Sequence, residues 1–246
     1  MPPDPAVRSR KFQKIAYPIL AIVLVYLVVA YVILPAAWRV DEHRHTTWDD
    51  APRITRTAND IPGDPLNIAL DGTETEVKQA MLKAGWFPAD PLTLESCLKI
   101  AEASVLKRPY TDAPVSNLIL FGRKQDLAFE QPVGDNPRKR HHVRFWRWDK
   151  PAPDGRPAWF GSATYDEHVG LSHTTGQVTH HISGDVDAER NHLVGDLEKT
   201  GLVAETYFLN GFHKVLEGRN GGGDPWHTDG KLTVVVFKSG EPAAKP

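Results

Sequence analysis

The hydrophobic positions divide the chain into one long apolar run and a series of shorter, periodic segments. The long run is Ile15–Leu34, 20 consecutive residues without a charged side chain. At about 1.5 Å of rise per residue, a helix of this length spans about 30 Å, the thickness of the hydrocarbon core of a bilayer. A secretory signal peptide is the alternative, but its apolar region is usually only about 7–15 residues long. We therefore expect an uncleaved transmembrane helix that binds the lipid bilayer.

Positive charge on the two sides of this run predicts its orientation. Residues 1–14 carry four basic side chains, Arg8, Arg10, Lys11 and Lys14. Residues 35–50, after the run, carry only two basic side chains among four acidic ones. Because the more basic flank usually stays in the cytoplasm, residues 1–14 are predicted to be a cytoplasmic tail. The rest of the chain is then expected outside, in the periplasm of a bacterium, with the helix in the inner membrane.

Composition also separates the parts of the chain beyond the apolar run. Residues 35–62 are rich in charged residues, Thr and Pro and have no apolar periodicity, which is typical of a tether. Residues 63–238 carry the periodic segments and are expected to form one domain with a substantial core. Residues 239–246 are expected to be a disordered tail.

Helical and extended patterns follow one another in the domain. Thr73 and Glu76 form a capping-box pattern ahead of a helix that Gly85 ends, and Leu92–Leu106 is expected to be a second helix. A further helix is predicted at 186–200. Short β-branched and aromatic segments predict strands at 64–70, 115–121, 127–131, 141–148, 158–165, 178–183, 203–209 and 232–237. This order predicts an α+β domain with a largely antiparallel sheet and packed helices.

Composition excludes several kinds of partner and site. The formal net charge is −2, and the short basic run Pro137–Arg140 precedes aromatic residues that alternate as a strand predicts. We therefore expect no nucleic-acid partner. Cys97 is the single cysteine, which excludes an internal disulfide and a zinc site built from several thiolates. Its thiol is expected to be buried and inert.

The histidines are concentrated in two predicted strands, as the pairs His141-His142 and His180-His181. Neighbouring residues in a strand face opposite sides of the sheet. His141 and His180 share their faces with aliphatic residues and are expected to be the more buried. Adjacent strands in register would bring the polar residues of the other face together in one cavity: His142, His181, Arg144 and Ser183.

The helix predicted at 186–200 carries charge on its buried side. Glu189 and Arg190 lie between the apolar positions Val186 and Leu193. Charged side chains on a buried stripe need partners. One interpretation is a structural Glu–Arg pair that fixes the packing of the helix. The other is that both residues line a cleft with the histidines.

Metal and phosphate sites have weaker support. The paired histidines and Asp166 offer imidazole and carboxylate ligands for zinc. No short ligand spacing such as HxxxH accompanies them, so we assign no metal ligands and leave the cofactor open. Gly218–Gly230 is glycine-rich but lacks the terminal Gly-Lys-Ser/Thr of a phosphate-binding loop. It is expected to be a flexible connection between strands.

Several short segments, in order along the chain, resemble the LssY C-terminal-like domain family. They lie between about residues 63 and 210: Pro65–Asn67, Ala84–Trp86, Ala113–Ser116, Phe121–Leu127, Arg140–Trp146, Ala163–Asp166, His181–Ile182 and Asp187–Arg190. The family is named after a component encoded with a bacterial type I secretion system. Some members carry the domain beside a phosphatidic-acid-phosphatase-like membrane region of several spans, whereas this chain has a single apolar run. The resemblance implies a bacterial envelope protein and no particular reaction.

Two hypotheses for function remain. The one we favour is a binding or scaffold module associated with envelope or secretion components. The alternative is a hydrolase of phosphoester or lipid-derived substrates, in which two histidines share acid and base roles. His181–Ser183 has the His-x-Ser form of some phosphoesterases. The candidate catalytic residues are His142, His181, Glu189 and Asp166. The candidate binding residues are Arg144, Arg190, Ser183 and Trp146.

Overall fold

The computed structural model describes residues 17–25, 28, 51–58, 60–89, 118–134, 139–173 and 178–239. The chain divides into two compact units, Met1–Trp48 and Asp49–Pro246. In the first unit, residues 17–25 are helical and exposed. Across the described ranges no helix is both long and apolar enough to span a membrane. The structure therefore gives no support to the transmembrane helix expected over Ile15–Leu34.

Some sequence-based expectations fall outside these ranges. They are the helix at Leu92–Leu106, the state of Cys97, and the tails expected at 1–14 and beyond Ser239.

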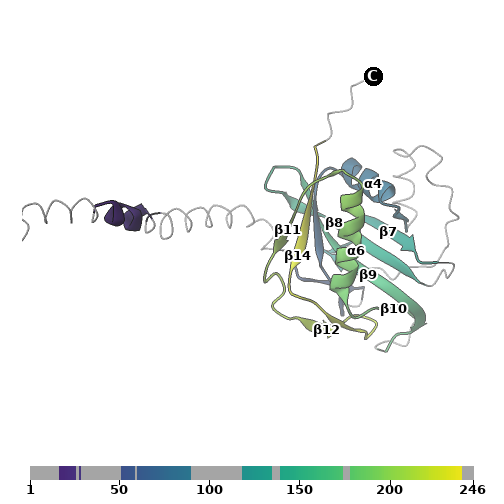
Figure 1. Ribbon diagram of the computed structural model, residues 1–246. Coiled ribbons are helices and arrows are strands. Elements are labelled where there is room, and N and C mark those ends of the chain that lie inside the picture. The colour runs from purple at the N-terminus through teal and green to yellow at the C-terminus, as the bar shows by residue number, and fades with distance from the viewer. Residues whose placement is uncertain are drawn as a thin grey trace, which may run out of the picture. The chain divides into compact units, whose positions relative to one another are not determined.

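An eight-stranded sheet forms the centre of the second unit (Figure 1). Its strands follow the order β11 (Val203–Leu209), β14 (Leu232–Phe237), β3 (Ile68–Asp71), β9 (Pro157–Leu171), β8 (Arg140–Pro151), β7 (Leu127–Pro132) and β4 (Phe87–Pro88). β10 (Val178–Ile182) pairs with the C-terminal part of β9. Each of these pairings is antiparallel except that of β14 with β3. The predicted α+β domain with a largely antiparallel sheet is confirmed.

Two helices, α4 (Glu74–Lys83) and α6 (Val186–Lys199), cover one face of this sheet. The predicted capping box forms: Thr73 Oγ1 accepts from Glu76 N at 3.2 Å, and Glu76 Oε2 accepts from Thr73 N at 2.7 Å. Gly85 follows α4 with φ of +80°, a conformation that glycine adopts without strain. Apolar side chains of both helices and the sheet form one core, which includes Val77, Met81, Phe129, Phe145, Leu193 and Leu197.

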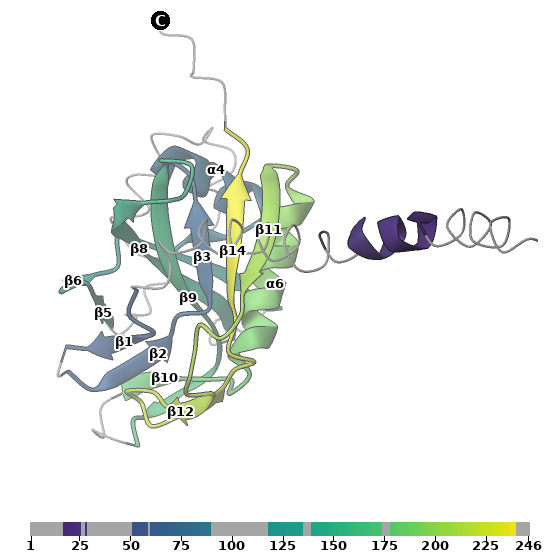
Figure 2. The same cartoon turned by 90° about the vertical axis from the view of Figure 1, so that its left-hand side faces the viewer.

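A four-stranded sheet lies on the opposite side of the eight-stranded sheet from α6 (Figure 2). Its order is β2 (Pro62–Pro65), β1 (Ile54–Thr57), β5 (Leu118–Leu120) and β6 (Arg123–Lys124). The Thr55 side chain on β1 is fully buried and donates to the Asp64 carbonyl at 2.8 Å. The extent predicted for the tether, residues 35–62, is therefore wrong at its end, where residues 54–57 form a strand of the domain. A four-residue strand among polar residues gives too little periodicity to be recognised.

Strands β8 and β9 place alternate side chains on the two faces, as predicted. His141, Val143 and Phe145 face the helices, where Val143 and Phe145 join the apolar core. Arg144 faces the four-stranded sheet, where it pairs with Asp64 of β2. The hairpin of β12 (Glu217–Arg219) and β13 (Pro225–His227) lies near β10 in both views.

Candidate functional site

The face of β8 and β9 that turns away from the helices carries a buried ionic network. Arg140 donates to Glu130 at 2.8 Å and to Asp166 at 3.2 Å. Arg144 lies 3.6 Å from Asp64. Burial raises the pKa of Asp64 and of Asp166, although Arg144 lowers the first and Arg140 the second. Candidate residues Asp166 and Arg144 are therefore held in ion pairs within the fold.

His142 lies in this network without a hydrogen bond to any described residue. Its side chain is 1% exposed, and both ring nitrogens lack a partner within the described ranges. Burial first, and then the nearby Arg144 and Arg140, hold the pKa of His142 well below its usual value. The ring is therefore neutral, and its buried nitrogens cost stability because they give up water without replacement.

His181 makes its polar contact elsewhere. Its Nδ1 lies 2.5 Å from Asp224 Oδ1, and its ring stacks on His168. Among the described residues no hydrogen bond joins His142 to His181, and the cavity expected between them stays a prediction. The predicted burial order is wrong: His181 is buried, like His142, whereas His141 is half-buried.

Glu189 pairs with His141, on the helix side of the sheet. The Glu189 Oε2 atom lies 2.7 Å from His141 Nδ1. Its other oxygen, Oε1, is buried and has no hydrogen-bond partner in the described part of the chain. Burial raises the pKa of Glu189, and the contact with His141 opposes that rise. Glu189 thus belongs with His141 and lies on the opposite face from His142 and Arg144.

Aromatic and imidazole rings surround this dyad. The His141 ring stacks on His192 with centroids 4.0 Å apart, and Tyr165 and Trp86 lie at 5.1 and 6.1 Å. Trp86 is buried, whereas His141, Tyr165 and His192 are half-buried and reach the surface. We call these five residues, Glu189 included, the helix-face cluster.

Gln131 and Asp196 fix the position of the His192 ring in the cluster. His192 Nε2 lies 2.8 Å from Gln131 Oε1 and 3.3 Å from Asp196 Oδ2. Trp86 donates to the same Asp196 oxygen at 3.3 Å. The cluster is thus assembled from β8, β9, α6 and Trp86, three residues after α4, and polar contacts fix the rings of His141, His192 and Trp86.

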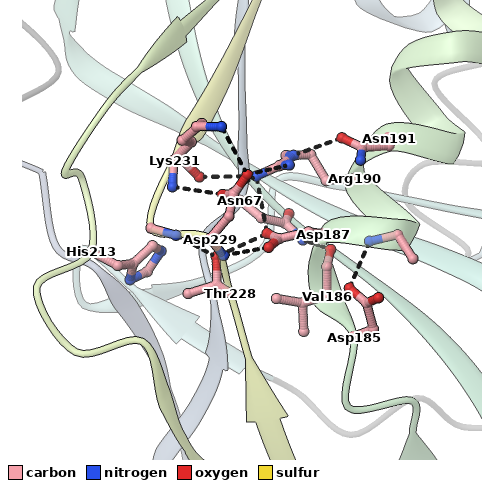
Figure 3. Close-up of polar contacts among 12 residues, drawn as sticks. Asn67, Asp185, Val186, Asp187, Arg190, Asn191, His213, Thr228, Asp229 and Lys231 are labelled. Carbon is pink, nitrogen blue, oxygen red and sulfur yellow. Dashed lines mark hydrogen bonds and ion pairs between the residues drawn. The ribbon is translucent and has the colours of Figure 1, made fainter.

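Arg190 belongs to a separate network near the start of α6 (Figure 3). Its guanidinium donates to both carboxylate oxygens of Asp229, at 2.9 and 3.2 Å, and to Asp187 at 3.0 Å. It also donates to the Lys231 carbonyl at 3.3 Å. Arg190 therefore joins α6 to the loop before β14. The predicted structural pair of Glu189 with Arg190 is wrong, because each has a different partner.

The two remaining candidates have structural contacts. Trp146 is fully buried and donates from Nε1 to the Arg123 carbonyl at 3.3 Å. Ser183 is held by its backbone, whose N–H donates to the Tyr165 carbonyl at 2.8 Å. Sequence reasoning found Glu189 but missed His141, Tyr165, His192 and Trp86. The signal was the apolar stripe of α6. If that stripe had been packed against the face of β8 that carries His141, the Glu189–His141 pair would have been predicted.

Fold and site together define an α+β domain with a buried ionic network on one face of its main sheet and a histidine–carboxylate cluster on the other. The family model of the LssY C-terminus matches residues 48–232. The chain belongs to this family. Comparison with curated proteins and with solved structures gives no match.

Proposed function

We propose that the chain is a single-pass protein of the bacterial inner membrane, and that its domain is a periplasmic binding module for an envelope or secretion component. The 20 uncharged residues of Ile15–Leu34 and the basic residues before them support the anchor and its orientation. Membership of the LssY C-terminus family supports the envelope setting.

The helix-face cluster is the binding surface in this proposal, and the state of Glu189 is the observation that supports it. Glu189 is buried, and one of its oxygens has no partner among the residues that the structure describes, while His141 and His192 reach the surface beside it. The dehydration of that carboxylate is already complete, and hydrogen bonds are stronger where water is excluded. A ligand at the other face would instead have to break the ion pairs of Arg140 and Arg144, which is costly for buried charges.

Photo-crosslinking tests this surface in the intact protein. A crosslinking side chain at Tyr165 is expected to give an adduct with one defined envelope component, and Glu189→Gln should abolish it. The same probe at Glu198, exposed on α6 outside the cluster, is the matched control and should give no such adduct. Equal adducts at both positions, or an adduct unaffected by Glu189→Gln, would place binding elsewhere.

The membrane part of the proposal has its own test. The chain is expected to sediment with membranes and to resist extraction by high salt, because apolar burial is not screened by ions. A reporter fused after Pro246 should behave as periplasmic. Cytoplasmic reporter activity would contradict the proposed orientation, and release of the protein by high salt would contradict the proposed membrane anchor.

The geometry of the Glu189–His141 pair also favours a second candidate, the hydrolase of phosphoester or lipid-derived substrates. A carboxylate on Nδ1 fixes the tautomer of a histidine and leaves Nε2 to act as a general base. This would transfer the catalytic role from His142 and His181 to His141. The test is a panel of phosphoesters. Hydrolysis by the unaltered protein that is lost in a folded His141→Gln variant would establish the hydrolase activity. Turnover by the unaltered protein no greater than that of the variant would refute it.

A further inference from the structure

A second group of potential ligands lies where the glycine-rich turn between β12 and β13 meets β9 and β10. His181 is on β10, His173 follows β9 by two residues, and Asp224 is in the turn. One potential ligand atom from each of the three lies within 4.8 Å of the other two. We call these three residues the His–His–Asp cluster. None of them belongs to the helix-face cluster.

Backbone hydrogen bonds hold the three segments together. The His173 N–H donates to the Gly222 carbonyl at 2.8 Å, which joins the end of β9 to the turn. Asp224 Oδ2 accepts from the Ile182 N–H at 3.2 Å, which joins the turn to β10. The expected flexible connection is therefore a structured turn, and the cluster is positioned before any ligand arrives.

The Asp224 carboxylate is further oriented by Asn220. The Asn220 side-chain oxygen accepts from the Asp224 N–H at 2.9 Å, and its amide lies 3.4 Å from Asp224 Oδ2. The same amide donates to Asp64 at 3.1 Å. Metal-binding carboxylates are commonly held by hydrogen bonds of this kind, so Asp224 has the supporting contacts of a ligand.

Gly170 and Gly222 have no side chains, and this provides space for the His–His–Asp cluster. A Cβ at Gly170 would lie 2.8 Å from His181 Nε2, so only glycine lets the imidazole lie against β9. A Cβ at Gly222 would lie 3.3 Å from an oxygen of Asp224 and 3.3 Å from one of Asn220. Glycine at these two positions therefore leaves room for the His181 ring against β9 and for the Asn220 and Asp224 side chains in the turn.

We propose that His173, His181 and Asp224 bind a divalent transition-metal ion, with Zn²⁺ as the ion that fits the ligand set. Two imidazoles and a carboxylate are common zinc ligands, and three protein ligands leave a fourth position for water or a ligand. His181 and Asp224 are buried, and His173 is exposed, which opens the site to solvent on one side. This site shares His181 with the set considered from the sequence, but Asp224 replaces Asp166, which is paired with Arg140.

Metal binding would change the contact between His181 and Asp224. The Nδ1 atom of His181 lies 2.5 Å from Oδ1 of Asp224, whereas two ligand atoms of one tetrahedral zinc lie about 3.3 Å apart. The two side chains would therefore separate slightly to hold the ion.

Zinc titration of the full-length protein in detergent, against a chromophoric chelator, tests the proposal. One Zn²⁺ per chain is expected, with a rise in the melting temperature. His173→Ala removes an exposed ligand with little effect on the fold and should weaken binding by at least about 10- to 100-fold, the loss seen for mere supporting residues. Asp224→Asn, which keeps the size of the side chain, should weaken binding similarly.

His168→Ala is the matched control, because His168 is also exposed and stacks on His181 but is not in the ligand set. It should bind zinc like the unaltered protein. Co²⁺ should give the intense visible absorption of a tetrahedral site, and His173→Ala should lose it. Equal losses in His168→Ala and His173→Ala, or no loss in His173→Ala, would show non-specific histidine binding and overturn the proposal.

Discussion

Glu189 Oε2 lies 2.7 Å from His141 Nδ1 and so joins α6 to β8 on the helix side of the main sheet. The adjacent residue, His142, points to the opposite side, where neither of its nitrogens has a hydrogen-bond partner among the described residues. Two neighbouring histidines thus lie in opposite environments, one half-exposed beside a carboxylate and one buried between arginines.

Glu189→Gln is expected to leave the free energy of unfolding at pH 7 unchanged or higher. Burial raises the pKa of Glu189 above its usual 4.5, so the folded protein keeps a proton that the unfolded chain loses. That stabilisation is complete below pH 4.5 and is lost as the pH rises through the folded-state pKa. Urea unfolding at a series of pH values should show that the free energy of unfolding of the variant increases relative to that of the unaltered protein as the pH rises. A variant that becomes relatively less stable instead would indicate a charged ion pair.

Arg190→Ala is expected to cost about 3–5 kcal/mol, because it leaves the carboxylates of Asp187 and Asp229 without their buried partner. Arg190→Lys should also be destabilising, since an ammonium cannot reproduce the two-pronged contact with Asp229. Thermal melts measure both. Arg147→Ala, at an exposed arginine of β8, is the control and should change stability by less than about 0.5 kcal/mol. A melt of Arg190→Ala that matches this control would refute the structural role.

Acid should weaken the same contact. Although burial raises the pKa of Asp229, hydrogen bonds from Arg190 and the Lys231 N–H lower it to about 2. A depressed carboxyl pKa stabilises the fold above its ordinary value of 3.8, and this stabilisation is lost as the pH falls toward 2. Asp229→Asn should therefore flatten the fall in stability between about pH 4 and pH 2. An unchanged slope in this range would show that Asp229 does not drive it.

His142→Phe is expected to keep or raise stability, since a buried polar group without partners costs about 1–3 kcal/mol. The pKa of His142 is lowered by burial, Arg144 and Arg140, so the unfolded chain takes up a proton that the fold excludes. The native protein should therefore lose stability below about pH 6.5, by roughly 1.4 kcal/mol per pH unit for such a group. Denaturant melts between pH 7 and pH 5 should show a shallower loss for the variant. An equally steep loss would assign it to other groups.

Truncation tests the domain boundary. A chain that begins at Asp49 keeps β1 and is expected to fold, whereas one that begins at Gly63 loses β1 between β2 and β5. The shorter chain exposes strand edges and should melt lower and aggregate. Size-exclusion chromatography and thermal melts compare the two. Equal behaviour would make β1 dispensable and restore the boundary predicted from the sequence.

Local patterns in the sequence predicted most of the elements. The Thr73 capping box, the strand alternation of β8 and the apolar stripe of α6 depend on neighbouring residues, so they can be read from a single chain. The two-residue strands and the polar strand β1 could not, because they are defined by their pairing partners.

The site depended on partners distant in sequence. His141 meets Glu189 and His192 only because α6 packs on the helix side of β8, and Asp224 meets His181 only because the turn folds back onto β10. Sequence reasoning assigned His141 and His142 to the correct faces of β8. It placed His180 with His141, and this is wrong, because His180 lies 3.3 Å from Arg140 and 3.6 Å from Asp166 in the ionic network. It assumed that polar neighbours mark the functional face, whereas on this sheet those neighbours pair with one another and bury His142.

Complementation of the gene-deletion phenotype by His141→Phe and by His142→Phe, at equal protein level, tests directly whether the helix-face cluster is the functional surface. The two variants carry the same substitution at adjacent positions that face opposite sides of one strand. We predict that His141→Phe fails to complement and that His142→Phe complements fully. Full complementation by His141→Phe, with loss of function in a folded His142→Phe protein, would contradict the account and return the site to the other face.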